Sequence, residues 1–243
     1  MKVLNDILGY KDLMIYQNPD FFCFSLDSVI LANFATIRLR DDKICDLGTG
    51  NGVIPLIFTK RTDKDIFCVE IQKKLYDLAV ESFKYNKVED RISVFNCDIS
   101  DDSKFSYVDF FDLVVCNPPY FSVEEKSLIN ISKEKQIARH ELKMDLDKLF
   151  STSFRILKTG GNLCIVHRPD RLMEILNKMQ KYNLEPKRIK FIYQNIETPS
   201  KLVLIEAQKY GKLGMKVDAP LIMYNIDGTM TNEYLNITQE VRR

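Results

Sequence analysis

The chain has 243 residues, 45% of them hydrophobic and 28% charged, with a formal net charge of +1. This is the composition of a globular enzyme with one sizeable core. The first twenty residues hold no signal-peptide-like apolar run, and no segment approaches the roughly 20 apolar residues of a membrane span. We therefore expect a cytoplasmic protein with no membrane partner, and we expect it to be a monomer.

The six cysteines form no C-x-x-C pair, and most of them lie inside apolar runs. They are Cys23, Cys45, Cys68, Cys97, Cys116 and Cys164. This pattern is typical of small buried hydrophobes in a reducing compartment. His140 and His167 fit no metal-ligand spacing, so we expect no metal.

Short apolar runs alternate with longer amphipathic runs along the chain. Strands are predicted over 43–47, 65–71, 92–96, 111–116, 162–167, 190–194 and 201–208, and helices over 53–59, 72–86, 146–157 and 171–182. Gly160 and Gly161 are expected to stop the third of these helices. The alternation predicts an α/β fold with a doubly wound, mostly parallel sheet. The last two strands have no helix between them, which predicts that they pair antiparallel or lie apart.

The chain is predicted to divide into three parts. Residues 1–40 form an N-terminal segment that packs on the catalytic domain, 41–210 form that domain, and 211–243 extend it. In an open parallel sheet, ligands bind at the carboxyl ends of the strands. Every motif described below follows such an end.

A glycine-rich loop follows the first predicted core strand. Gly48, Gly50 and Gly52 have the spacing G-x-G-x-G, which is not the dinucleotide spacing and lacks the P-loop lysine. Glycines here let the backbone approach a ligand, and the helix start offers free N–H groups. A tight turn without a ligand is the alternative.

Two acidic residues follow the next two strands. Glu70 lies 18 residues after Gly52, near the separation at which a carboxylate meets ribose hydroxyls. Asp98 follows the third strand, where it could accept a hydrogen bond from an adenine amino group. A turn or cap residue is the alternative for Asp98. Together with the glycine loop, the two carboxylates make a more specific signal than any one of them.

The fourth strand runs directly into Asn117-Pro118-Pro119-Tyr120. A planar amino nitrogen is a poor nucleophile, and a site helps by accepting hydrogen bonds from its two N–H groups. The amide oxygen of Asn117 and the backbone carbonyl of Pro118 could do so, since the prolines fix the course of the chain. Tyr120 offers a flat face for a base, which Pro119 and Phe121 could extend. A plain Asn-Pro turn is the alternative.

Taken together, these residues resemble the class I S-adenosylmethionine-dependent methyltransferases. The resemblance implies a Rossmann-like, seven-stranded sheet with its last strand antiparallel. It also implies that the three loop glycines line the cofactor, that Glu70 holds the ribose, that Asp98 reads the adenine, and that Asp46 lies close to the methionine end. Asn117 would contact the cofactor as well.

The Asn-Pro-Pro-Tyr motif is similar to that of enzymes that methylate adenine N6 and of enzymes that methylate protein glutamine. Together with residues 22–32 (FCFSLDSVILA) and 138–141 (ARHE), it resembles the bacterial family that methylates adenine 37 of a valine tRNA, in the anticodon loop. That resemblance implies that Phe24 and Asp27 border the cofactor pocket. A release-factor glutamine N5-methyltransferase and a ribosomal guanine N2-methyltransferase remain alternatives.

Basic residues are concentrated in the second half of the chain. Between Arg155 and Lys216 there are 13 lysines and arginines against 5 acidic residues. Such an excess can form a face that meets phosphates, although ordinary solvation is the alternative. Arg139, Arg168 and Arg171 are the candidates for contacts with tRNA.

Overall fold

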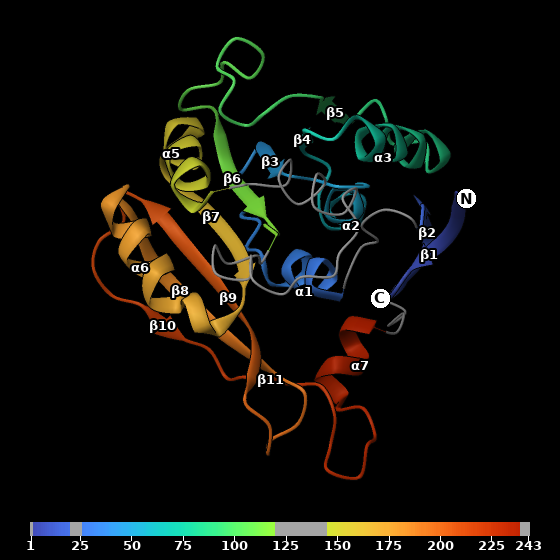
Figure 1. The fold of residues 1–243 in the computed structure, drawn as a ribbon, viewed down its shortest axis with the longest axis vertical. Helices are drawn as coiled ribbons and strands as arrows, with labels where there is room; N and C mark the ends of the chain where they lie inside the picture. Colours follow the sequence, from blue (N-terminus) through green and yellow to red (C-terminus); the bar gives the residue numbers. More distant parts are fainter. Residues whose placement is uncertain (1, 20–25, 120–144, 239–243) are drawn as a thin grey trace, which may run out of the picture.

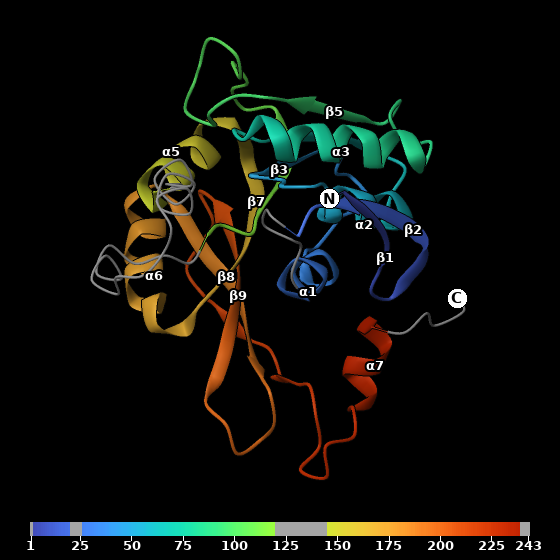
Figure 2. The same ribbon diagram turned by 45° about the vertical axis from the view of Figure 1, so that its right-hand side comes forward.

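The computed structural model describes residues 2–19, 26–119 and 145–238. A sheet lies between two layers of helices (Figures 1 and 2). Its seven longer strands are, in spatial order, β8 (Leu184–Tyr193), β9 (Ser200–Lys209), β7 (Leu157–His167), β6 (Phe111–Cys116), β3 (Lys43–Leu47), β4 (Asp65–Val69) and β5 (Ile92–Phe95). β9 is antiparallel to both of its neighbours, and the other pairs among the seven are parallel. The predicted doubly wound sheet with a reversed last strand is confirmed.

Each face of the sheet carries its own hydrophobic core. The helices α1 (Leu26–Phe34), α2 (Val53–Arg61) and α3 (Lys73–Tyr85) cover one face, and α5 (Leu146–Ile156) and α6 (Leu172–Lys181) cover the other. Successive strand residues point to opposite faces, so Val115 joins the first core and Cys116 the second. This explains why β6 is buried along its whole length and is apolar apart from Asp112.

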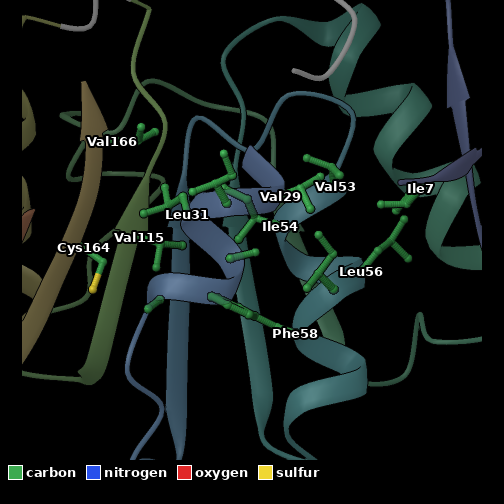
Figure 3. Close-up of a cluster of buried hydrophobic side chains, with 14 of the residues drawn as sticks. Ile7, Val29, Leu31, Val53, Ile54, Leu56, Phe58, Val115, Cys164 and Val166 are labelled. Carbon is green, nitrogen blue, oxygen red and sulfur yellow. The ribbon is translucent and has the colours of Figure 1, made fainter. Parts of the chain in front are cut away.

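Figure 3 shows part of the first core. Side chains from α1, α2, β6 and β7 converge on one another, and Ile7 reaches the same cluster from the N-terminal hairpin. The five described cysteines are buried and form no disulfide. Cys164, labelled in Figure 3, packs there as an apolar side chain.

An N-terminal hairpin was not predicted. It consists of β1 (Val3–Ile7) and β2 (Tyr10–Gln17), paired antiparallel. β2 packs on α3, where the backbone N–H of Met14 donates to the Asn86 side chain at 2.9 Å and that of Tyr16 donates to the Ser82 hydroxyl at 2.9 Å. Polar side chains of one helix thus satisfy a strand edge that would otherwise lie unpaired.

The C-terminal part adds three short elements, which the sequence analysis did not predict either. The two-residue strands β10 (Lys216–Val217) and β11 (Leu221–Ile222) pair with β8, and α7 (Asn232–Thr238) follows. The hairpin turn and α7 are in close contact, because a Cβ added at Gly9 would lie 2.3 Å from the carbonyl oxygen of Ile237. The two ends of the described chain therefore pack together (Figure 1). The division at residues 40 and 210 stays a prediction.

The predicted role of Gly160 and Gly161 was wrong. α5 ends at Ile156, and Leu157 already begins β7, so the glycines lie within the strand. The pairing of β6 with β7 shifts register across this stretch, and Gly160 has a φ of +78°. A left-handed residue in a strand irregularity favours glycine. In the sequence, such a glycine looks the same as a glycine that ends a helix. None of the described helices is long and apolar enough to cross a membrane.

Candidate active site

Three adjacent parallel strands end at one edge of the sheet. β3 lies between β4 and β6, with Asp46 aligned with Cys68 on one side and Val115 on the other. Asp46 is the fourth residue of β3, Glu70 directly follows β4, and Asn117 directly follows β6. The carboxyl edge of the sheet therefore brings together three side chains that the sequence spreads over 72 positions.

The glycine loop folds back onto the end of β4. The backbone N–H groups of Gly48 and Thr49 both donate to the carbonyl of Val69, at 2.8 and 3.0 Å. Gly50 has a φ of +60°, and a Cβ added there would meet nothing within 4 Å. The backbone at Gly50 thus borders open space, which is what close approach of a ligand requires.

Gly52 differs from Gly50 in what surrounds it. A Cβ added at Gly52 would lie 2.5 Å from the ring of Phe83 on α3, and its φ is +92°. Position 52 therefore requires glycine because any side chain there would interfere with the packing of α2 against α3. A cofactor contact of Gly52 stays a prediction.

Glu70 holds the loop in place. One carboxylate oxygen accepts from the backbone N–H of Gly50 at 2.8 Å, and the other accepts from that of Gln72 at 2.8 Å. The side chain of Asn96 donates to the Glu70 carbonyl at 2.8 Å. Burial raises the pKa of Glu70, and the backbone hydrogen bonds oppose that shift. Glu70 therefore joins the ends of β4 and β5 to the glycine loop.

Asp46 is fully buried beneath this loop. Among the described residues, neither of its carboxylate oxygens has a hydrogen-bond partner, and the hydroxyl of Thr49 has none either. Burial raises the pKa of Asp46 to about 7, with a further contribution from the nearby charge of Glu70. A buried carboxyl without partners is costly, and such groups occur where a ligand completes the site.

The side chain of Asn117 is anchored to α1. Its Nδ2 donates to the hydroxyl of Ser28 at 2.8 Å. Ser28 is buried and belongs to the first turn of the helix, and Asp27 beside it is half-buried. After Asn117, Pro118 is buried and Pro119 half-buried. Ser28 was not singled out by the sequence, because 89 positions separate it from Asn117.

Asp98 lies in a polar turn. One carboxylate oxygen accepts from the backbone N–H and the hydroxyl of Ser100, at 2.8 and 2.7 Å, and the other accepts from Lys148 at 3.3 Å. Although partial burial acts to raise it, these hydrogen bonds lower the pKa of Asp98 overall. The structure thus gives Asp98 the turn geometry named as its alternative, and its contact with an adenine stays a prediction.

The candidate RNA-binding arginines that the structure describes are both paired. Arg168 forms an ion pair with Asp170 at 3.0 Å. The guanidinium of Arg171 donates to both carboxylate oxygens of Glu174, at 2.8 and 2.7 Å. His167 ends β7 fully buried; burial lowers its pKa to about 4, with Arg171 adding to the shift. His167 therefore stays neutral at physiological pH.

The basic excess of the second half is offset in three dimensions. Several of its cations pair with acidic residues that lie outside the stretch in sequence. These pairs are Arg155 with Asp102, Lys158 with Asp112, Lys190 with Glu233 and Lys209 with Asp109. A local count of charge therefore overstates the basic face.

Several predicted site residues lie outside the described residues. They are Phe24, Tyr120, Phe121 and Arg139. Of the residues that sequence reasoning missed, Ser28, Thr49 and Asn96 contact the site. The described residues contain no group of three or more His, Cys, Asp or Glu that could hold a metal ion.

Comparison with solved structures identifies the fold. A crystal structure from Agrobacterium tumefaciens, described as a predicted O-methyltransferase, has a TM-score of 0.68 at 21% identity and covers 90% of this chain and 99% of its own. The geranyl diphosphate C-methyltransferase of Streptomyces coelicolor A3(2), solved with S-adenosyl-L-homocysteine, has a TM-score of 0.55 at 16% identity, covering 75% of this chain and 76% of its own. The fold is the Rossmann-like methyltransferase fold.

The sequence itself narrows the class to a family. The methyltransferase small domain matches residues 26–191, and the chain belongs to this family. A curated relative from Cytophaga hutchinsonii, named tRNA1(Val) (adenine(37)-N6)-methyltransferase, is 27% identical over 191 residues, which is 79% of each chain. The resemblance stated from the motifs is confirmed.

Proposed function

We propose that the protein transfers a methyl group from S-adenosylmethionine to the exocyclic N6 of an adenine in tRNA, with adenine 37 of a valine tRNA as the target. The observation that carries the proposal is the placement of the Asn117 amide at the end of β6, beside the ends of β3 and β4. The name of the Cytophaga hutchinsonii relative supports the same acceptor.

The residues at the edge of the sheet suit this cofactor. Gly50 leaves room for a ligand against the backbone, and Glu70 offers carboxylate lone pairs that can accept from ribose hydroxyls. The partnerless carboxyl of Asp46 would meet the cationic methionine end, and Asp27 would border it from α1. When bound, the cofactor supplies an electrophilic methyl group on a sulfonium.

The chain's own part in the chemistry is to bind and orient the acceptor amine. The amide oxygen of Asn117 and the carbonyl of Pro118 would accept hydrogen bonds from its two N–H groups. This favours the tetrahedral geometry in which the nitrogen lone pair can attack. No strong base is required, because a methylated, cationic nitrogen loses a proton readily to water. Tyr120 would stack on the base.

Recognition of tRNA would come mainly from contacts with its backbone. Arg139 and Arg168 are the candidates that we retain. Arg171 is a weaker candidate, because an RNA phosphate would have to displace the bidentate carboxylate of Glu174. We expect the protein to act as a monomer in the cytoplasm.

The variant Asn117→Ala tests the proposed clamp. We expect it still to bind S-adenosylmethionine in calorimetry and to lose turnover by a factor of about a hundred or more, because an acceptor aimed at the transition state is gone. Unchanged turnover would contradict the role of Asn117.

The acceptor is tested separately from the clamp. Purified protein with labelled S-adenosylmethionine is given total tRNA in one reaction and a release factor in another. Mass spectrometry of tRNA nucleosides from cells that lack the protein should show that N6-methyladenosine is missing at one position. Labelling of the release factor alone would identify a glutamine methyltransferase instead.

A further inference from the structure

A hydrogen bond between α1 and the end of β6 holds the side-chain amide of Asn117. An asparagine amide has one acceptor oxygen and an NH₂ group with two donors, and the two ends have nearly the same shape. Only the oxygen can accept a hydrogen bond from a substrate amine. A site that uses Asn117 in this way must therefore hold the amide in one of two orientations.

Ser28 faces the donor end of this amide. Asn117 Nδ2 donates to Ser28 Oγ at 2.8 Å, and the serine side chain is only 6% exposed. Since Oδ1 lies on the other side of the amide from Nδ2, this hydrogen bond leaves Oδ1 turned away from α1. Turning the amide by 180° would exchange the two ends and present N–H groups to the amine. A serine hydroxyl can also donate, so the hydrogen bond holds the amide in the observed orientation as long as Ser28 acts as the acceptor.

The serine lies on a firmly held helix. The four residues after Ser28 are buried in the core shown in Figure 3. At the C-terminal end of α1, the guanidinium of Arg61 donates to the carbonyl of Ala32 and, at 2.9 Å, to that of Ala35. These contacts fix α1 relative to α2, so the hydroxyl of Ser28 is a fixed reference for Asn117.

We propose that Ser28 is a positioning residue that holds the Asn117 amide in its observed orientation for methyl transfer. The inference rests on the proposed function, in which Asn117 Oδ1 accepts from the substrate amine. On this proposal Ser28 affects turnover through Asn117 and does not itself contact the reacting atoms.

The test compares Ser28→Ala with Ser28→Thr, which keeps a hydroxyl. We expect Ser28→Ala to lower kcat about ten-fold, the factor that corresponds to the loss of one hydrogen bond, while KM for S-adenosylmethionine and for tRNA stays within about two-fold. Ser28→Thr should recover most of kcat. Ser28→Cys replaces it if the threonine variant does not fold.

A double-mutant cycle separates positioning from a general structural role. In single-turnover reactions, adding Ser28→Ala to Asn117→Ala should lower the rate no further, because the amide to be oriented is already absent. Equal losses in both backgrounds would overturn the proposal. The matched control is Ser153→Ala, which removes a fully buried helical hydroxyl on α5 and should leave kcat unchanged.

Each outcome separates this inference from the proposed function. If Asn117→Ala loses turnover and Ser28→Ala does not, the clamp stands and the positioning role of Ser28 is refuted. If Asn117→Ala retains turnover, the clamp itself fails, whatever Ser28→Ala does. A loss in Ser28→Ala accompanied by a lower melting temperature and a raised KM would also count against positioning.

Discussion

Replacing Asp46 with asparagine removes a titratable group from the core beneath the glycine loop while nearly preserving its shape. In the folded protein, burial raises the pKa of this carboxyl to about 7. In the unfolded chain it titrates near its ordinary value of about 3.9. Between these two values the folded state holds a proton on Asp46 that the unfolded state has released, so the stability of the wild-type protein falls as the pH rises.

The size of this effect follows from the difference in pKa. A difference of about three pH units corresponds to a destabilisation of roughly 4 kcal/mol once the pH is above 7, and about 1.5 kcal/mol of it is already present at pH 5. Asp46→Asn is neutral at every pH. Relative to wild type, its free energy of unfolding should therefore rise by about 2.5 kcal/mol between pH 5 and pH 8.

Urea unfolding of the cofactor-free protein at four pH values from 5 to 8 measures this change. Any constant cost of burying the new amide cancels, because only the pH dependence is compared. Asp98→Asn is the control, because the pKa of Asp98 is lowered and its charge stabilises the fold equally at every pH in this range. Its pH profile should therefore run parallel to that of wild type. Parallel pH profiles for wild type and Asp46→Asn would refute the view that Asp46 is buried without a partner.

Two further predictions use pairs of residues that look alike in the sequence. Gly52→Ala should lower the free energy of unfolding by about 2 kcal/mol or more, because its Cβ would overlap the ring of Phe83, whereas Gly50→Ala should lower it by about 1 kcal/mol for its left-handed backbone and mainly weaken cofactor binding. Urea unfolding measures the stability of each variant, and calorimetry measures its affinity for the cofactor. Equal losses of stability in the two variants would contradict the assignment. Arg168→Ala should reduce the salt dependence of tRNA binding by about one phosphate contact, and Arg171→Ala should reduce it less, because Glu174 already holds the guanidinium of Arg171. Filter binding at several salt concentrations tests this. Equal slopes for both variants would contradict the different roles assigned to the two arginines.

The sheet could be predicted because its strands are short and buried on both faces. Strands such as β3 and β6 appear as short, mostly apolar runs between turn residues, and their predicted bounds match the structure. The reversed β9 followed from the absence of a helix between it and β8. These features are local in sequence, so a single chain is enough to read them.

The N-terminal hairpin escaped prediction although it left a signal. In β2, Leu13, Ile15 and Gln17 are buried on alternate positions, and Gly9 forms the turn before it. A glutamine on the buried side interrupts the apolar alternation that marks a half-buried strand. β10 and β11 are two residues long, which is too short for any periodicity.

The sequence could predict which candidate residues lie at strand ends, but not the contacts that support them. Asp46, Glu70 and Asn117 follow from their places at strand ends. The hydrogen bonds from Asn117 to Ser28 and from Asn96 to the Glu70 carbonyl depend on how α1 and β5 pack in three dimensions. The charge excess failed as a guide for the same reason, because its partners are distant in sequence.

Two residues that break local rules lie at the carboxyl edge of the sheet. Asp46 is a buried carboxyl with no hydrogen-bond partner in the part of the chain that the structure describes, and Gly50 leaves open space beside a left-handed backbone. Elsewhere, buried charges such as Lys209 are paired with a carboxylate and accepted by backbone carbonyls. Unsatisfied polar groups are tolerated where a bound ligand supplies the missing interaction. The free-energy cost of burying the Asp46 carboxylate is therefore offset only when a cation is bound beside it. The pH dependence of stability should consequently weaken in the presence of S-adenosylmethionine, because a bound cation lowers the pKa of the carboxylate beside it.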